Sequence, residues 1–373
     1  MANIGSTSAP STNTVYYDAL LTSTMDAFVK SGTLTDQIFK DNRWLALLRL
    51  KDCVIKQNGG ERIRIPLMYG NNSTIGAKSG YGIIDTTPQD GMTTAFYEWR
   101  ELAGSISISR KEERQNSGEA QILDLLKNKI MQAKMTMSEE LNRQLLQGTV
   151  NGTTFVPGTA ATDASAYELN PLGYFLSKDN TANPADGGNV GNLSRAETWW
   201  RHRTAIADTA TPETGNSFAI SVTTYAGMEA AFKRLYNYCG RGSGGYPDMG
   251  VTDQVTYETY ENSLGSKIRY TNTQMADMGF DTVKLLGATL IWDEVVPDIE
   301  AGTTAIAKGT LFLLNSKFYH LVIDSQTDVV TTPFIEPENQ TAKTAKLLFM
   351  GNAGISNMRK HGVMYATGQT ILS

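Results

Sequence analysis

The sequence predicts an α+β protein in which an extended β-hairpin loop and a long helix precede a mixed α+β domain. Three observations support this prediction. Two strand-like segments enclose a glycine-rich excursion that fits no helix, and a helical period of apolar residues follows over residues 116–148. Helix-like and strand-like segments are then mixed over residues 195–333, as in α+β domains.

Composition indicates a globular chain with little excess charge. Its 373 residues are 40% hydrophobic and 19% charged, and the formal net charge is -5. Strong binding to a nucleic-acid backbone comes from clustered Lys and Arg, so we expect only weak, non-specific contact with DNA. The start of the sequence lacks the basic and apolar regions of a secretory signal, and no apolar stretch reaches the roughly 20 residues of a membrane span. We therefore expect a soluble protein, made in a cytoplasm and without a membrane partner.

The N-terminal region, residues 1–59, predicts an arm followed by short helices. Its first 14 residues are small and polar, which indicates a flexible segment. Amphipathic segments then cover residues 15–32 and 33–50. Gly32 is expected to end the first helix, and Thr35 or Asp36 to cap the second.

Residues 60–110 predict the extended loop. In GGERIRIPLMYG the apolar residues at 63, 65 and 67 alternate with other types, and in AFYEWRELAGSISIS the residues at 102, 104, 106 and 108 do the same. This is the period of a strand with one wet face, so we expect two strands of a hairpin. About 25 residues with glycines at 76, 80, 82 and 91 join them. Connections of this length are uncommon inside compact domains and indicate a functional segment or one that reaches for a partner.

The loop begins with GNNSTIGAKS at residues 70–79, which is close to the phosphate-binding pattern G-x-x-x-x-G-K-[S/T]. Five residues instead of four separate Gly70 from Gly76, and Ala77 stands before Lys78. The following SGYGIIDTTPQDG cannot form the helix whose N-terminus would hold a phosphate. We expect a turn here, as also in GYGIID at 80–85 and GRGSGG at 240–245.

The strongest helical signal lies at residues 116–148. Its apolar residues recur on one narrow face, Asn116 with Glu119 resembles a capping box, and Gly148 is expected to end the helix. At about 1.5 Å per residue it is roughly 45 Å long, which suits a spine lying across a sheet.

The remaining chain predicts an irregular connection, a domain boundary and a second domain. Residues 149–193 show little periodicity, and the second domain follows from about 195 to 333. We expect helices at 195–209, 223–240 and 253–265, the last capped by Thr252 or Asp253, and strands at 248–252, 281–297 and 310–324. The apolar groups LLFM and GVMY near the C-terminus are expected to pair as strands with the first part of the chain.

No catalytic, cofactor or metal site is apparent, and we predict that the protein is not an enzyme. The two cysteines, Cys53 and Cys239, have no companion at metal spacing and are expected to be buried thiols. None of His202, His320 and His361 forms a pair at metal-ligand or acid/base spacing, and we expect His202 at the surface. The adjacent pairs Glu112–Glu113 and Glu139–Glu140 are expected to be solvated, and Trp199, Trp200, Tyr257 and Tyr260 to lie in the core or in subunit contacts.

The order of these elements resembles the major capsid proteins of tailed bacteriophages, with the Hong Kong 97-like fold. The resemblance rests on RIRIPLMYG and AFYEWRELAGSISIS ahead of the long helix, and on VKLLGATLIWDEVVP, LFLLNSKFYHLVID and FIEPENQTAKTAKLLFMGNAGISNMRKHGVMY after it. It implies that residues 60–110 are an extended loop lying over a neighbouring subunit. Residues 111–194 and 334–373 would form the peripheral domain with its sheet and spine helix, and residues 195–333 the axial domain.

The resemblance also implies partners, a location and contact residues. The partners are other copies of the chain in hexamers and pentamers, a separate scaffolding protein or assembly without one, a portal protein, a decoration protein and packaged double-stranded DNA. The location is the virion. Contacts between subunits are expected from six residues of the extended loop: Tyr69, Lys78, Tyr81, Asp85, Phe96 and Trp99. Some members of the family carry a Lys-Asn crosslink, but we do not expect one from Lys78 with Asn352 or Asn357.

Two alternatives remain open. An encapsulin-type compartment has the same fold and holds enzymes instead of a genome. A nucleotide-dependent enzyme would use the 70–79 loop, and ATP binding that disappears in Lys78→Ala would support it.

Overall fold

The structure is a computed structural model. It describes residues 42–115, 125–147, 149–150, 153–154, 168–177, 189–207, 218–220, 224–264, 283–296, 309–338 and 341–365. The predicted N-terminal arm, the first predicted helix and the caps Thr35, Asp36, Asn116 and Gly148 lie outside these ranges. The described chain divides into two compact units. The first includes Ala103–Glu139 and Val329–Leu348, and the second includes Asn42–Leu102, Glu140–Asp328 and Phe349–Ser373.

Three long elements contribute residues to both units. They are strand β4 (Arg100–Ser109), helix α4 (Leu125–Leu146) and strand β17 (Ala342–Ile355). Helix α4 confirms the described part of the predicted spine helix. The predicted alternation along β4 is confirmed as well, since Ile106 and Ile108 are buried while Ala103, Ser105 and Ser107 are exposed.

In the first unit a helix and two strands pack on one another. A methyl group added at Gly104 of β4 would come within 4.0 Å of Met137 on α4 and 3.9 Å of Leu347 on β17. Strand β16 (Val330–Thr331) pairs antiparallel with β17. The short helix α3 (Arg110–Gln115) begins with a capping box, because Glu112 N–H donates to Ser109 Oγ and Ser109 N–H donates to Glu112 Oε2. Glu112 also forms an ion pair with Lys129 at 2.9 Å and its side chain is only 13% exposed, so the prediction of a solvated Glu112 is wrong.

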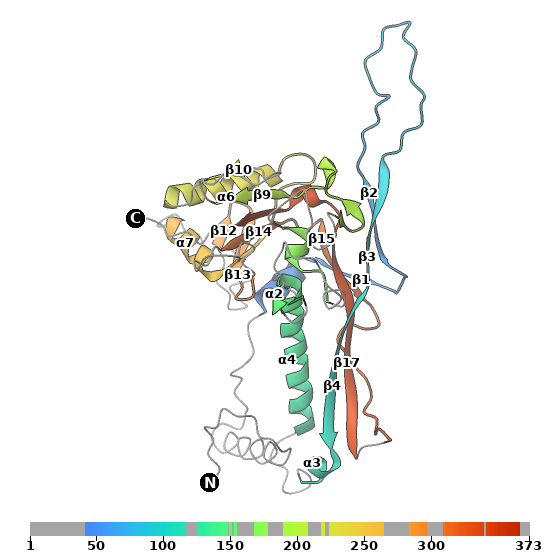
Figure 1. Cartoon of the computed structure of the whole chain (residues 1–373), viewed down its shortest axis with the longest axis vertical. Coiled ribbons are helices and arrows are strands. Elements are labelled where there is room, and N and C mark those ends of the chain that lie inside the picture. The colour runs from blue at the N-terminus through green and yellow to red at the C-terminus, as the bar shows by residue number, and fades with distance from the viewer. Residues whose placement is uncertain are drawn as a thin grey trace. The chain divides into compact units, whose positions relative to one another are not determined.

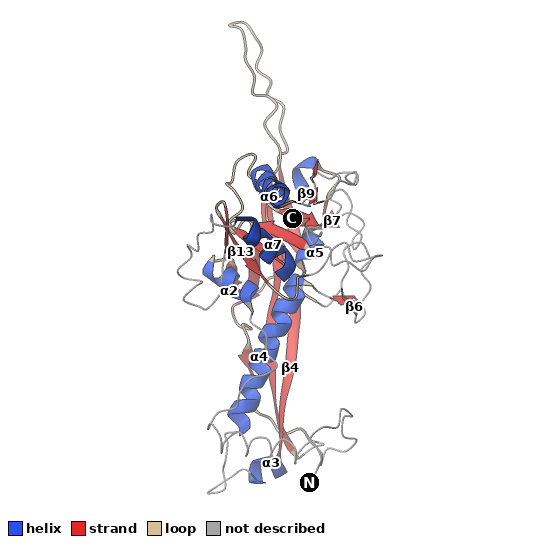
Figure 2. Cartoon of the chain, turned by 90° about the vertical axis from the view of Figure 1, so that its left-hand side faces the viewer, coloured by secondary structure: helices blue, strands red, loops and turns tan. Residues whose placement is uncertain are grey.

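The second unit contains a seven-stranded sheet in the order β10-β9-β18-β14-β11-β13-β12. Its strands are β9 (Arg203–Ile206), β10 (Phe218–Ala219), β11 (Met249–Thr252), β12 (Val283–Leu285), β13 (Ala288–Trp292), β14 (Thr310–Leu314) and β18 (Gly362–Tyr365). Helices α6 (Tyr225–Cys239) and α7 (Gln254–Leu264) lie against one face of this sheet (Figure 2).

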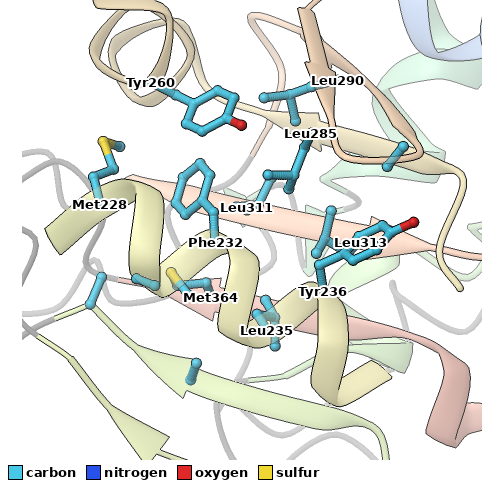
Figure 3. Packing of buried hydrophobic residues seen from close by; sticks show 14 of the residues in the cluster. Met228, Phe232, Leu235, Tyr236, Tyr260, Leu285, Leu290, Leu311, Leu313 and Met364 are labelled. Atoms are coloured by element: carbon cyan, nitrogen blue, oxygen red, sulfur yellow. The ribbon is translucent and has the colours of Figure 1, made fainter. Parts of the chain in front are cut away.

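The core between these helices and the sheet is apolar and fully enclosed. Phe232 of α6 stacks on Tyr260 of α7 with ring centroids 5.0 Å apart, and Leu311 and Leu313 of β14 reach the same cluster (Figure 3). Both predicted helices are present, and the predicted cap Asp253 of α7 is confirmed. Thr224 accepts a hydrogen bond from Gly227 N–H, and Asp253 accepts one from Thr256 N–H, which satisfies donors that the helix itself leaves unpaired.

The remaining strands of the second unit pair around β15 (Tyr319–Asp324). Strand β1 (Val54–Gln57) runs parallel to β15, and residues 351–355 of β17 run antiparallel to it. Helix α2 (Arg43–Leu50) precedes β1, and its Trp44, Leu47 and Leu48 are buried. Further short elements are β5 (Thr149–Val150), β6 (Thr153–Thr154), α5 (Leu172–Phe175), β7 (Asn189–Val190), β8 (Leu193–Ser194) and two single 3-10 turns, η3 (Thr198–Trp200) and η5 (Met358–Lys360).

Three predictions of secondary structure are wrong. The segment 195–209 is not a helix but contains η3 and β9, because β9 is paired by β18 on one side and β10 on the other. The segment 310–324 is not one continuous strand but forms β14 and β15, which belong to different sheets. The GVMY strand, β18, pairs with β14 and β9 rather than with the first part of the chain. In each case a distant strand decides the conformation.

Replacing Phe232 by Ala should destabilise the second unit strongly. Its ring is fully buried against Tyr260, so truncation leaves a cavity and should lower the free energy of unfolding by about 3–5 kcal/mol. Denaturant unfolding followed by circular dichroism measures the change. Tyr225→Ala on the exposed start of the same helix is the control and should cost far less. Equal effects of the two substitutions would contradict this packing.

Candidate inter-subunit surface

The predicted extended loop is a two-stranded hairpin with a long, open tip. Strand β2 (Ile63–Met68) pairs antiparallel with β3 (Met92–Tyr97), from Ile63 opposite Tyr97 to Met68 opposite Met92. Residues 69–91 join the strands without a helix or strand of their own and extend beyond them (Figure 1). The second strand of the hairpin therefore ends at Tyr97, and the prediction that it continues to Ser109 is wrong. Residues 100–109 form β4, which pairs with β17.

The tip departs from its strands at two facing glycines. The amides of Tyr69 and Gly70 both donate to Gly91 O, at 2.9 and 3.3 Å. A methyl group added at Gly70 would lie 3.0 Å from the Gly91 Cα, so a side chain at either position would push the two strands apart. The glycines thus permit close approach of the backbones where the loop begins.

The tip exposes an unusual amount of apolar surface. Seven of the fifteen large hydrophobic side chains that are exposed in the described residues lie between residues 68 and 92. Ile75 is 81% exposed, Ile83 89% and Ile84 71%. Burying such a side chain is worth about 1.5–3 kcal/mol, and the isolated chain leaves this stabilisation unused. Clustered exposed apolar residues are typical of an interaction surface.

Short polar turns hold the tip in shape. Asn72 Oδ1 accepts hydrogen bonds from the amide and hydroxyl of Thr74, at 2.9 and 2.6 Å. Asp85 Oδ1 does the same for Thr87, at 3.0 and 2.6 Å, and the bond from the Thr87 hydroxyl lowers the pKa of the Asp85 carboxyl. These Asx turns fix the backbone locally without covering the apolar side chains.

The six predicted contact residues fall into two groups. Lys78, Tyr81 and Asp85 lie in the tip with exposed side chains. The other three, Tyr69, Phe96 and Trp99, lie at or below the ends of the strands and have partners within the chain. Tyr69 stacks on Trp199 at 4.8 Å, Arg64 lies 5.8 Å above the Phe96 ring, and Trp99 Nε1 donates to Gly60 O at 2.9 Å. A role in subunit contacts stays a prediction for all six.

The base of the hairpin is fixed by buried hydrogen bonds that sequence reasoning missed. The Tyr97 hydroxyl donates to Ile355 O at 2.9 Å and accepts from Ile355 N–H at 3.3 Å. Burial raises the pKa of this hydroxyl, so it keeps the proton that it donates. Asn352 Nδ2 donates to Glu98 O at 2.7 Å, just beyond the end of β3. The sequence signal for Tyr97 was its place on the buried side of β3, two residues after Ala95.

The near match to a phosphate-binding loop does not form one. No helix follows Lys78 in residues 69–91, and Asn72 instead forms the turn with Thr74. The two asparagines considered for a crosslink are engaged elsewhere. Asn352 is fully buried, and Asn357 Oδ1 accepts from Arg359 N–H at 3.2 Å.

Several titratable side chains outside the hairpin are buried. Cys53 and Cys239 are buried free thiols as predicted, and burial raises the pKa of each to about 12. The prediction of a surface position for His202 is wrong, since it is fully buried beside Ser177 O, and burial lowers its pKa. Trp200, Tyr257 and Tyr260 are in the core, as expected. Across the described ranges no three His, Cys, Asp or Glu side chains gather as metal ligands, and no helix is long and apolar enough to cross a membrane.

Comparisons with known proteins identify the fold. No family model and no curated protein matches the chain. Among solved structures, the capsid asymmetric unit of cyanophage A-1(L) matches with a TM-score of 0.60 at 15% identity, over 90% of this chain and 96% of that one. The capsid of Myoviridae phage XM1 matches with a TM-score of 0.52 at 10% identity, over 90% and 95%. The holo-SrpI encapsulin complex of Synechococcus elongatus PCC 7942 matches with a TM-score of 0.50 at 10% identity, over 93% and 98%. The predicted capsid fold is confirmed.

Replacing Tyr97 by Phe should loosen the base of the hairpin. The buried backbone groups of Ile355 would lose their hydroxyl partner, at a cost of about 1–3 kcal/mol. Denaturant unfolding measures the loss, and amide hydrogen exchange should quicken around Ile355. Tyr81→Phe removes the same hydroxyl from the fully exposed tip and should change neither quantity. A Tyr97→Phe protein as stable as the control would rule out this role of the hydroxyl.

Proposed function

We propose that this chain is the major capsid protein of a tailed bacteriophage, which assembles through hexamers and pentamers into an icosahedral shell around packaged double-stranded DNA. The observation that supports this most is the fold match to the cyanophage A-1(L) capsid over 90% of the chain. The chain is a structural protein in this proposal, without a catalytic site. It acts in the virion after synthesis in the host bacterial cytoplasm.

The exposed tip supplies a physical basis for assembly. In the proposal, residues 60–110 lie over a neighbouring subunit and bury the apolar side chains that the single chain exposes. Each contact is modest, but a symmetric shell repeats it at every subunit, and contacts whose rotations close produce a closed particle. The hydrogen bonds of Tyr97 and Asn352 would transmit the tip's contacts to the folded chain.

The other parts of the chain take the roles that the resemblance implies. Residues 111–194 and 334–373 would form the peripheral domain, and residues 195–333 the axial domain at capsomer centres. A separate scaffolding protein, a portal protein and a decoration protein are the expected partners. The net charge of -5 is consistent with a wall that encloses DNA without binding it strongly.

An encapsulin-type compartment is the second candidate function. The match to the SrpI encapsulin has a TM-score of 0.50 and supports this function. The match to the cyanophage A-1(L) capsid has a TM-score of 0.60 and supports the phage capsid function more strongly. A nucleotide-dependent enzyme receives no support from the 69–91 loop, where the geometry of a phosphate site is not formed.

Placing charges on the tip should block assembly without unfolding the protein. Ile83 and Ile84 make no part of the core, so Ile83→Asp with Ile84→Asp should leave the circular dichroism and thermal unfolding unchanged. The same pair should abolish shells seen by negative-stain microscopy, because carboxylates would have to be buried against a neighbour.

The matched control is Asn71→Asp with Thr86→Asp, which adds equal charge at exposed polar positions of the same tip. Shells are expected to persist in it. Normal shells from the double isoleucine variant would contradict the proposed contact of the tip. If the unaltered chain yields only compact monomers, with and without a candidate scaffold, the capsid proposal itself fails.

The contents of natural particles should separate the two shell functions. We expect particles purified from the source cells to hold double-stranded DNA that resists added nuclease, with portal and terminase genes beside the gene for this chain. Electrophoresis of nuclease-treated particles measures the DNA, and mass spectrometry identifies enclosed proteins. An enclosed enzyme without protected DNA would favour the encapsulin function.

A further inference from the structure

Four cationic side chains meet at the C-terminal end of α6. Strands β9 and β18 are parallel neighbours with Arg203 opposite Gly362, so the start of β9 lies beside the residues that precede β18. Those residues form η5 and include Arg359 and Lys360. Helix α6 ends on the same strands, since a methyl group at Gly362 would lie 2.6 Å from Cys239 Sγ, and Arg241 follows directly.

An aromatic ring organises two of these cations. The guanidinium of Arg203 lies 4.6 Å from the centroid of the Tyr238 ring, and that of Arg241 lies 4.5 Å from it. Burial lowers the pKa of Arg203, and the nearby charges of Arg359 and Arg241 lower it further. Arg241 and Arg359 therefore each lie close enough to Arg203 for their charges to act on it.

Lys360 has a different, internal role. Its ammonium is buried, and its three N–H donors are shared among four carbonyl oxygens of the loop after α6, those of Gly240, Arg241, Gly242 and Gly245, at 3.0–3.4 Å. It thereby satisfies carbonyls at the end of the helix, where a cation is favourable. The glycine-rich GRGSGG segment wraps this ammonium, which leaves Lys360 without a free donor for another partner.

The three arginines are not enclosed by a loop of carbonyl oxygens as Lys360 is. Among the residues that the structure describes, no carboxylate lies within 4.0 Å of Arg203, Arg241 or Arg359, and the ion pairs involve other cations. The side chains of Arg241 and Arg359 are exposed, and that of Arg203 is half-buried. In a chain of net charge -5, three neighbouring arginines that no carboxylate of the described residues pairs with are ready to bind an anion from outside.

We propose that Arg203, Arg241 and Arg359 form a site for the phosphodiester groups of a nucleic-acid backbone. A guanidinium presents paired donors that match phosphate oxygens and is weakly hydrated, which suits it to this contact better than lysine. The group is open to solvent and offers several cations rather than one enclosed pocket, so it fits an extended polyanion rather than a small anion. The inference rests on the proposed function insofar as the polyanion would be the packaged genome, and it assigns the weak DNA contact to a defined surface.

Salt-dependent binding of a fluorescent DNA duplex to the purified full-length chain tests the site. Each phosphate contact contributes about 0.9 to the slope of log affinity against log salt concentration. Arg241→Gln with Arg359→Gln should therefore reduce the slope by about 1.8 and weaken binding on the order of a hundredfold at ~50 mM salt. Both side chains are exposed, so circular dichroism should show an intact fold.

The matched control removes two other exposed cations, through Arg49→Gln with Lys284→Gln, and should keep the slope of the unaltered chain. Equal slopes for the two double variants, or no binding by the unaltered chain, would overturn the inference. Tighter binding of polyglutamate than of DNA would also overturn it and point to an acidic protein partner. Shells that form normally while the slope does not change would refute this site and leave the proposed function intact. Salt-dependent DNA binding through these arginines by a chain that never forms shells would support the site and refute the proposed function.

Discussion

The seven-stranded sheet of the second unit depends on the pairing of strand β18 with its two neighbours. It stands between β9 and β14, so that, among the described strands, β9 and β10 join the rest of the seven-stranded sheet only through it. All four of its residues are buried. During folding, the two parts of this sheet can therefore join only when residues 362–365 pair with both of them. Pairing of this kind joins strands that are far apart in sequence, which costs loop-closure entropy and slows folding.

The position of β18 also fixes the residues that precede it, including Lys360. Because η5 directly precedes β18, the ammonium of Lys360 reaches the loop after α6 and is held there by four carbonyl oxygens. Burying an ammonium is costly, and charge-assisted hydrogen bonds offset this cost only when the donors are satisfied. The glycines of this loop allow the backbone to turn its carbonyl oxygens toward the ammonium. Gly242, Gly244 and Gly245 have positive φ angles, and a methyl group at Gly244 would lie 2.8 Å from the Phe318 ring. A segment that looked like an ordinary turn is thus shaped by a residue far along the chain.

Sequence reasoning succeeded where the signal was local. Helices α6 and α7 were predicted as helical segments, α7 with Thr252 or Asp253 as its cap, and β2 was predicted from its alternation. It failed where a distant partner decides. The residues of β9 are compatible with a helix, and pairing with β18 and β10 makes them a strand. Likewise, His202 looked exposed in a charged stretch but is buried next to that strand.

The hairpin shows the same limit. Its length, glycines and lack of helix were readable, because they are properties of the segment itself. The break at Glu98 and Trp99 could not be predicted. The alternation of apolar residues resumes in β4, so the sequence pattern indicates one continuous strand. At the end of the hairpin, Tyr97 donates to Ile355 O, Trp99 donates to Gly60 O and Asn352 donates to Glu98 O, and none of these three partners belongs to the alternating segment.

The base and the tip of the hairpin differ in how their free energy depends on a partner. At the base, the Tyr97 and Asn352 bonds are buried, so they already contribute to the stability of the single chain and would be costly to break. At the tip, the Asx turns are exposed and the large apolar side chains remain in water. A firm base reduces the conformational entropy that the tip must lose on binding, because the position where it begins is already fixed. The apolar surface can then contribute most of its stabilisation to the contact itself, which is the arrangement expected of a chain whose final state is an assembly.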